Sequence, residues 1–294
     1  MCLYVDALAT LSVISGAAFA QSSVTLYGVV DAGIIHTAAG TKADVGLNGG
    51  PRLGVKGSED LGGGLSSTFM IESAVNMAGG DTTIPAGNVL NGNRGATVGL
   101  KGSFGAVDVG TKNLSVGFYT TAAVETTGMA NYGVTGIAGG SRNANPAVQY
   151  TSPTMNGLTV RASMVMANNN GGDAQNAIGA VYTMGGLTLA GARTDNGAAA
   201  KGTDKFYGAK YNFGPAAVHV TSTDNNGTKA TTYGLTAPMG AASLFIDYKN
   251  PKTGADTTII GGTYNLSKST FLYGAVNNTD GADTTTLVGI RKNF

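Results

Sequence analysis

The chain has 294 residues, of which 42% are hydrophobic and only 12% are charged, and its formal net charge is +1. A balance so close to neutral argues against a nucleic-acid-binding protein. The single cysteine is Cys2, so the chain beyond it can form no disulfide, thiolate metal site or thiol nucleophile. The 47 glycines and 12 tyrosines, with no tryptophan, are typical of an all-β protein.

Residues 1–20 are expected to be a signal peptide that is cleaved on export. They contain an apolar stretch too short to cross a bilayer, and they end in Ala18-Phe19-Ala20 before Gln21, which is the small-x-small pattern of a cleavage site. No later apolar run reaches the roughly 18 residues that a membrane helix needs. The composition does not change along residues 21–294, so the sequence predicts a single exported domain over that range.

From residue 22 onward, apolar and polar residues alternate in short runs that turn signals separate, which is typical of strands. The predicted strands cover residues 22–36, 51–60, 64–76, 93–102, 106–113, 146–152, 157–167, 176–183, 187–195, 204–213, 216–224, 230–238, 241–249, 257–266, 269–277 and 284–294. This makes sixteen strands, an even number, as a single-chain bacterial membrane barrel requires.

The connections between the predicted strands alternate strictly between short and long. The short connections cover residues 59–64, 103–105, 153–157, 184–186, 214–215, 239–240 and 266–269. The long connections cover residues 37–50, 76–92, 113–145, 168–175, 196–203, 225–229, 250–256 and 278–283. Short periplasmic turns and longer outside loops produce this alternation in a membrane barrel, whereas a soluble sandwich has no reason to sort its loops in this way.

The strands themselves have two chemically different faces. In the first strand, Val24 and Leu26 lie on one face and Thr25 and Tyr27 on the other. An apolar outer face and a polar lining suit a barrel with lipid outside and water inside, although a soluble antiparallel sheet shows the same period. Strands at both ends of the exported chain can pair with each other, and closure leaves no unpaired edge in lipid. We therefore predict an all-β fold, a 16-stranded antiparallel transmembrane β-barrel.

Several segments match a known family. They are residues 22–33, residues 52–65 with the run Arg52-Leu53-Gly54-Val55-Lys56-Gly57-Ser58-Glu59-Asp60-Leu61-Gly62, residues 98–105, residues 264–270, and the terminal Phe294. Together they resemble the general bacterial porins, specifically the trimeric sixteen-stranded type of β-proteobacteria. The resemblance implies a homotrimer in outer-membrane lipid that lets small hydrophilic solutes and ions diffuse through a water-filled channel. It also implies that Phe294 is an assembly signal for the barrel-insertion machinery.

The resemblance further implies that the third long loop, residues 113–145, folds inward and narrows the pore. Basic side chains on the wall would face it. The pore-constriction residues expected on these grounds are Arg52, Lys56, Arg94 and Arg142, with the acidic residues Glu125, Glu72 and Asp108. The period of two supports an inward direction for Arg52 and Lys56, although ordinary solvated charges near a strand end would look the same. The excess of basic groups predicts a weak preference for anions.

The strand that carries Arg94 gives a further argument for a trimer. If Arg94 points inward, the outward residues of its strand are Gly95, Thr97, Gly99 and Lys101, which make a poor lipid-facing surface and would suit a neighbouring subunit.

Other motifs support no competing chemistry. The run Gly62-Gly63-Gly64 lacks the Lys-Ser/Thr spacing of a phosphate loop, and His36 and His219 have no metal-ligand partner nearby in the sequence. We therefore expect no catalytic or metal site, no cofactor and no enzymatic activity. Two alternatives stay open: a substrate-selective channel, for which the aromatic residues Phe118, Tyr119 and Tyr132 speak, and an adhesin or structural β-protein without a pore.

Overall fold

The computed structural model describes residues 22–75, 77, 90–111, 115–127, 146–166, 174–197 and 202–294. Its strands are β1 (Ser23–Thr37), β2 (Gly40–Val45), β3 (Arg52–Gly62), β4 (Leu65–Val75), β5 (Leu90–Gly102), β6 (Gly105–Thr111), β7 (Ala147–Thr151), β8 (Leu158–Val165), β9 (Gln175–Met184), β10 (Leu187–Asp195), β11 (Thr203–Asn212), β12 (Ala217–Asn225), β13 (Thr228–Met239), β14 (Ala242–Pro251), β15 (Thr257–Asn265), β16 (Thr270–Thr279) and β17 (Thr285–Asn293), and its helix is α1 (Val116–Val124). The expected signal peptide, residues 1–20, lies outside the described residues.

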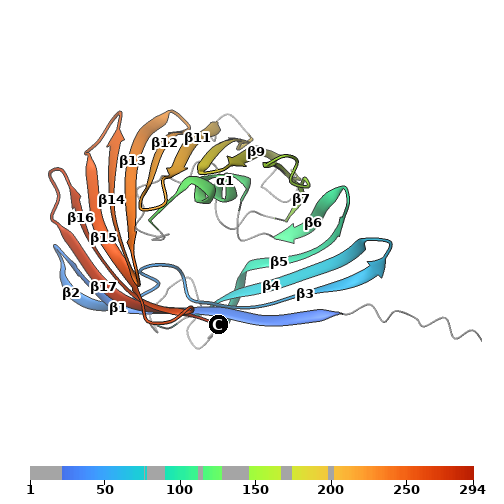
Figure 1. Cartoon of the computed structure of the whole chain (residues 1–294), viewed down its shortest axis with the longest axis horizontal. Coiled ribbons are helices and arrows are strands. Elements are labelled where there is room, and N and C mark those ends of the chain that lie inside the picture. The colour runs from blue at the N-terminus through green and yellow to red at the C-terminus, as the bar shows by residue number, and fades with distance from the viewer. Residues whose placement is uncertain are drawn as a thin grey trace, which may run out of the picture.

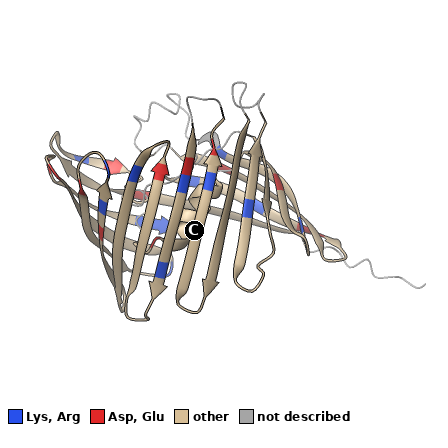
Figure 2. Cartoon of the chain, turned by 90° about the horizontal axis from the view of Figure 1, so that it is seen from above, with Lys and Arg blue, Asp and Glu red and all other residues tan. Residues whose placement is uncertain are grey.

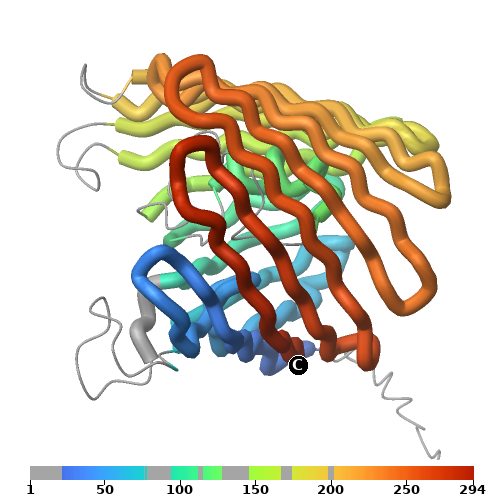
Figure 3. Tube along the Cα trace, turned by 90° about the vertical axis from the view of Figure 1, so that its left-hand side faces the viewer, coloured from blue at the N-terminus to red at the C-terminus, as the bar shows by residue number. Residues whose placement is uncertain are grey.

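The strands form one antiparallel sheet that closes into a barrel (Figure 1). Strands β3 to β17 pair in chain order, and β1 closes the ring by pairing with both β3 and β17. The register of β1 with β17 runs from Val29 opposite Asn293 to His36 opposite Thr286. The first and last strands therefore lie side by side, as the blue and red tubes of Figure 3 show. The predicted pairing of the two chain ends is confirmed.

The wall of the barrel has the sixteen strands that the sequence predicts, with ends shifted by a few residues. The seventeenth strand of the sheet, β2, lies in residues 37–50, which we predicted as a loop. Thr37 pairs with Gly40 across a turn of two alanines, and the His36 ring lies 2.7 Å from the Thr41 hydroxyl. The segment Gly40–Val45 is polar and short, so its alternation is too weak to predict a strand.

The outer surface follows the predicted pattern. On β1, Leu26 and Ile34 are exposed on the outside of the barrel, while Tyr27 and Asp31 point inward and bond to other wall residues. In a membrane this outer face contacts lipid.

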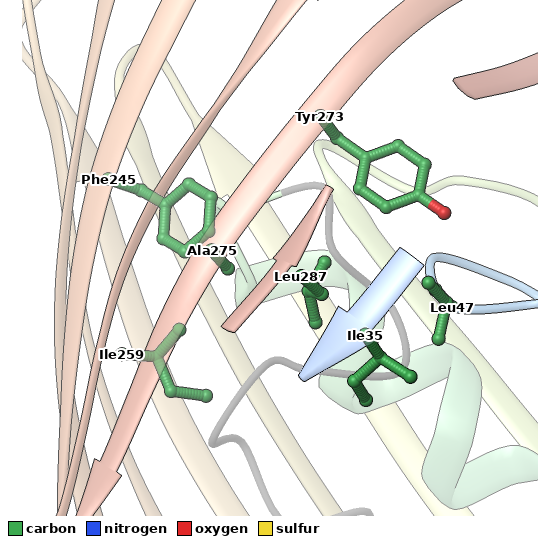
Figure 4. Packing of buried hydrophobic residues seen from close by; sticks show 7 residues of the cluster. All are labelled: Ile35, Leu47, Phe245, Ile259, Tyr273, Ala275 and Leu287. Carbon is green, nitrogen blue, oxygen red and sulfur yellow. The ribbon is translucent and has the colours of Figure 1, made fainter. Parts of the chain in front are cut away.

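The inner surface differs from the prediction on one side. A buried apolar cluster lies where β1 and β14–β17 meet, and its members are Ile35, Leu47, Phe245, Ile259, Tyr273, Ala275 and Leu287 (Figure 4). The period of two places Ile35 on the same inward face as Asp31, and Ile259 opposite the exposed Ile260. The polar lining that the strand period predicts is therefore interrupted here by apolar side chains. These apolar side chains bury their surface against one another and exclude water, so this part of the interior is a hydrophobic core.

The faces of β5 also differ from the prediction. Glu72 of β4 lies opposite Gly95, but Ala74 lies opposite Asn91, so the register shifts between them. Beyond this irregularity Val98 and Leu100 are 63% and 46% exposed on the outside, while the other face lies in the lumen. A shift of one residue exchanges the two faces of a strand. The predicted outward set of Gly95, Thr97, Gly99 and Lys101 is wrong, and β5 presents an ordinary apolar face to lipid.

Helix α1 lies inside the barrel, against the inner side of β8–β12 (Figure 1). The Ser115 hydroxyl caps its first turn by accepting from the Phe118 N–H at 3.2 Å. Thr120 packs against Gly179 of β9, where the absence of a side chain lets the helix approach the wall. The predicted inward fold of the third long loop is therefore confirmed for residues 115–127. Within the described residues, no helix has the length and apolarity that a membrane-spanning helix needs.

Candidate pore constriction

Two arginines and one carboxylate from three neighbouring strands meet on the inner wall. Arg94 Nε of β5 donates to Glu72 Oε1 of β4 at 2.7 Å, and Arg52 Nε of β3 lies 3.8 Å from Glu72 Oε2. Tyr27 of β1 donates its hydroxyl to Glu72 Oε2 at 3.0 Å. Glu72 is only 5% exposed, so its carboxylate has little contact with water. The two guanidinium groups and the tyrosine hydroxyl take the place of that water as its partners. The charges of Arg52, Arg94 and Glu72 sum to +1 on this part of the wall.

Lys56, another residue expected at the constriction, follows Arg52 along β3 and lies on the same face of the strand. Its ammonium group stands 5.2 Å from the centre of the Tyr27 ring. Lys56, Glu72 and Asp108 line one cavity of about 410 Å³ together with Tyr119 of α1. The cavity therefore runs between the β3–β6 wall and the inward-folded loop.

Tyr119, which lines this cavity, belongs to a residue pair that we did not predict. The Arg161 guanidinium of β8 lies 4.0 Å from the centre of the Tyr119 ring. Burial raises the pKa of the Tyr119 hydroxyl above its usual value, although nearby Arg161 lowers it, so the hydroxyl stays protonated at neutral pH. The period of two places Arg161 on the same face of β8 as Thr159 and Ser163, but no signal in the sequence connects it with Tyr119.

Polar contacts fix the far end of α1 to the wall. Lys210 Nζ of β11 donates to the Ala123 carbonyl at 2.6 Å, where a cation also complements the negative end of the helix. After the helix, the Thr126 hydroxyl lies 3.0 Å from His219 Nδ1 of β12 and accepts from Thr236 of β13 at 2.8 Å. The loop is thus held at points that run from β8 to β13.

The expected acidic residues occupy two different places. Glu72 lies on the same wall as the arginines and is directly bonded to Arg94, so it offsets one of their two charges instead of facing them across the pore. Glu125 follows α1; its carboxylate accepts from the Thr127 hydroxyl at 2.7 Å, and the structure describes no contact of Glu125 with Arg52 or Arg94. Arg142 and Tyr132 lie outside the described residues.

Charges are sparse over the whole barrel. Figure 2 shows basic and acidic positions scattered over many strands, with most of the wall uncharged. Among the residues that the structure describes, no three His, Cys, Asp or Glu side chains gather in a group that could hold a metal ion.

Comparison with known proteins gives a consistent result. A family model described as Gram-negative porin matches residues 7–284. The chain is 30% identical to outer membrane porin protein 32 of Delftia acidovorans, over 96% of this chain and 90% of that protein. It is also 30% identical to an outer membrane porin of Bordetella pertussis, over 91% of both chains.

Solved structures agree in fold. An anion-selective porin from Comamonas acidovorans superposes with a TM-score of 0.67 at 24% identity, covering 93% of this chain and 100% of that one. A mutant of the Rh. blastica porin superposes with a TM-score of 0.75 at 18% identity, covering 92% of this chain and 100% of that one. With the closed barrel and its inward loop, these matches show that the chain belongs to the Gram-negative porin family and is an outer-membrane porin, a passive channel for small hydrophilic solutes.

Proposed function

We propose that the channel is weakly anion-preferring and that its constriction lies between the β3–β6 wall and α1. The observation that carries this proposal is the sharing of Glu72 by Arg52 and Arg94, because one carboxylate leaves one positive charge uncompensated beside the cavity. Lys56 and Asp108 add opposite charges to the lining of this cavity, and Arg161 adds a cation beside the Tyr119 ring. Basic groups that line a narrow aqueous passage favour anions. Arg142 and Glu125 belong to the proposal by resemblance.

A planar-bilayer recording of the purified protein tests this function. We expect stepwise ohmic channels and, in a KCl gradient, a reversal potential of the sign that chloride permeation gives. The potential should diminish at high salt, because mobile ions screen charges in water. Absence of channel steps from protein that migrates as a folded, heat-modifiable barrel would contradict the channel function.

We propose a homotrimer as well, on the resemblance to the trimeric porins alone. The outward face of β5 no longer supports it, since Val98 and Leu100 give that strand an apolar surface. Light scattering in mild detergent, with cross-linking of intact cells, distinguishes a trimer from a monomer. A mass of one chain in both experiments would overturn the trimer.

Phe294 is the proposed assembly signal for the barrel-insertion machinery. Its N–H and C=O pair with those of Gly28 at 3.1 and 2.9 Å, so it ends the last pairing of the barrel seam. Deletion of Phe294 should lower the amount of folded protein in the outer membrane, whereas refolding in detergent should be less affected. Normal outer-membrane levels of the deletion variant would refute the signal role.

A substrate-selective channel is the second candidate, and the stacked pair Tyr119–Arg161 beside the cavity favours it. A planar cation over an aromatic ring can bind a solute that has both an anionic group and a flat apolar part. Block of the ion current by micromolar benzoate, with no block by acetate, would support selectivity. Equal, weak effects of the two anions would leave the diffusion channel as the better description. Neither candidate requires a cofactor or catalysis.

A further inference from the structure

The segment that connects β2 with β3 turns back into the barrel. We refer to residues 46–51 as the strap. Within it, Leu47, Asn48, Gly49 and Pro51 are buried. The Gly49 N–H donates to the Gly46 carbonyl at 3.2 Å, and both glycines have positive φ, at 152° and 69°. A tight turn of this kind needs glycine, because other residues are strained at those angles. The strap is therefore a folded element and not an extended connection.

One end of the strap is attached to the wall by Asp31 and Arg291. Asp31 of β1 is fully buried; its carbonyl accepts from the Gly46 N–H at 2.9 Å, and its Oδ1 accepts from the Asn48 N–H at 3.3 Å. Tyr273 of β16 donates to the same Oδ1 at 2.7 Å. Arg291 Nη1 of β17 donates to the Asn48 carbonyl at 2.8 Å. Three hydrogen bonds from β1 and β17 thus reach the strap, and Tyr273 holds the Asp31 carboxylate in place.

An apolar contact adds to these bonds. Leu47 packs into the buried cluster with Ile35, Tyr273 and Leu287 (Figure 4). The Asn48 side chain contributes nothing comparable, since both polar atoms of its amide are buried without a hydrogen-bond partner among the described residues. The strap is therefore held through its backbone and through Leu47.

The other end of the strap reaches the two arginines of the constriction. Arg52 Nη1 donates to the Gly50 carbonyl at 3.4 Å. A side-chain carbon placed on Gly50 would lie 3.2 Å from Arg94 Nη1, so Arg94 passes directly over this glycine. The Pro51 carbonyl accepts from the Val75 N–H of β4 at 3.1 Å. One short segment thus connects the Asp31–Arg291 contacts with the Arg52–Arg94–Glu72 group.

Arg291 also borders open space. It lines a cavity of about 390 Å³ together with Thr126, Phe271 and Asn293. If the bond from Arg291 to the Asn48 carbonyl is lost, the strap is held at this end by the Asp31 bonds and by the packing of Leu47. The position of the strap therefore depends on a few contacts, of which Arg291 supplies one beside open space.

We propose that the strap is a second constriction element, opposite α1, and that Asp31 and Arg291 are positioning residues that act through it on Arg52 and Arg94. This inference rests on the proposed channel function and deepens it. The strap narrows the lumen from the β17–β1–β3 side and keeps both guanidinium groups beside the cavity. Its release would enlarge the opening and would let Arg52 and Arg94 swing away from their present positions.

Two pairs of variants test the proposal in bilayer recordings. Arg291→Gln removes the anchor, and its neighbour Lys292→Gln removes an equal charge from the exposed outer face. Gly49→Ala leaves all charges unchanged, but its new Cβ would lie 2.7 Å from Arg291 Nη1. Gly62→Ala is the control, because Gly62 also has a positive φ, of 82°, and no atom lies within 4 Å of a Cβ there. We expect Arg291→Gln and Gly49→Ala to raise the single-channel conductance roughly 1.5-fold or more and the controls to leave it unchanged.

The reversal potential separates positioning from simple loss of charge. Gly49→Ala should shift it toward zero although no charge has changed, because Arg52 and Arg94 lose their fixed places. Arg291→Lys should restore most of the conductance of the parent, since an ammonium group can still donate to the Asn48 carbonyl. Equal conductance and equal potential in Gly49→Ala and Gly62→Ala, both folded, would overturn the proposal.

Cysteine labelling reports on the strap without any current. In a Cys2→Ser background, Leu47→Cys should react with a charged methanethiosulfonate far more slowly than Ala43→Cys on the exposed part of β2. Adding Arg291→Gln should accelerate the reaction at position 47 roughly tenfold, which is the effect of losing one charged hydrogen bond. Equal rates at positions 47 and 43 would overturn the strap even if Arg291→Gln does not fold. A protein that forms no channels but labels as expected would instead contradict the proposed function.

Discussion

The aromatic ring of Phe294 covers Gly28 on the outside of the barrel, at the seam where β17 meets β1. A side-chain carbon on Gly28 would lie 2.9 Å from Phe294 Cε1 and 2.8 Å from the Arg52 carbonyl oxygen. The same two residues exchange backbone hydrogen bonds. The last residue of the chain therefore fills the outer surface of the seam and ends its pairing, and a glycine opposite it is a steric requirement.

Gly28→Ala should therefore destabilise the barrel. The added methyl group meets the Phe294 ring and the backbone of β3, and overpacking of this kind costs roughly 1–3 kcal/mol. Gly191→Ala is the matched control, because a carbon there finds its first neighbour at 3.6 Å. Urea unfolding of the refolded protein in detergent measures both. Equal unfolding midpoints for the two variants would show that the ring moves aside without cost.

The apolar cluster inside the barrel predicts a contrast between two adjacent isoleucines. Ile259 is 2% exposed in the cluster, whereas Ile260 is 56% exposed on the outer face. Ile259→Ala should lower the free energy of unfolding by roughly 2–5 kcal/mol, as in a protein core. Ile260→Ala should cost clearly less, because its side chain contacts lipid or detergent whether or not it is shortened. Similar losses in the same unfolding experiment would mean that the cluster is not a core.

Tyr119 should limit the width of the channel. Its ring lies between Arg161 and the cavity that Lys56, Glu72 and Asp108 line. Tyr119→Ala should raise the single-channel conductance, because it removes bulk from the passage and frees Arg161 to move. Tyr207→Ala, which removes a 62% exposed tyrosine from the outer face of β11, should leave conductance unchanged. An unchanged conductance in Tyr119→Ala would place the narrowest point elsewhere.

The wall of the barrel could be predicted from the sequence because its signals are local. Each strand alternates along its own length, and most of the short turns contain a glycine or proline. Met184 and Leu187, for example, pair directly across a turn in which Gly185 has a φ of 56°. Such features do not depend on what the strand contacts.

Apart from the short hairpin strand β2, the differences involve contacts that the chain makes with itself at long range. The register shift between Glu72 and Ala74 exchanges the two faces of β5. Assigning faces by the strand period of two cannot detect such a shift. The inward apolar residues of β14–β17 look like any other strand residues until Leu47 is seen to pack on them. The pairing of Glu72 with Arg94 and of Arg161 with Tyr119 likewise depends on register and on the place of α1.

Arg52 and Arg94 are expected to set the charge of the constriction. Replacing both by serine changes the sum of the Arg52–Arg94–Glu72 group from +1 to −1, and adding Glu72→Gln to the double variant brings it to zero. The triple variant also removes the buried carboxylate that has lost both arginine partners in the double variant, so it separates selectivity from instability.

The decisive measurement is the reversal potential of these variants in a KCl gradient at low salt. We predict an anion-selective potential for the unaltered protein, a cation-selective potential for Arg52→Ser with Arg94→Ser, and an intermediate value for the triple variant. The same potential in all three proteins, each folded and conducting, would show that these side chains do not face the permeating ions and would contradict the account.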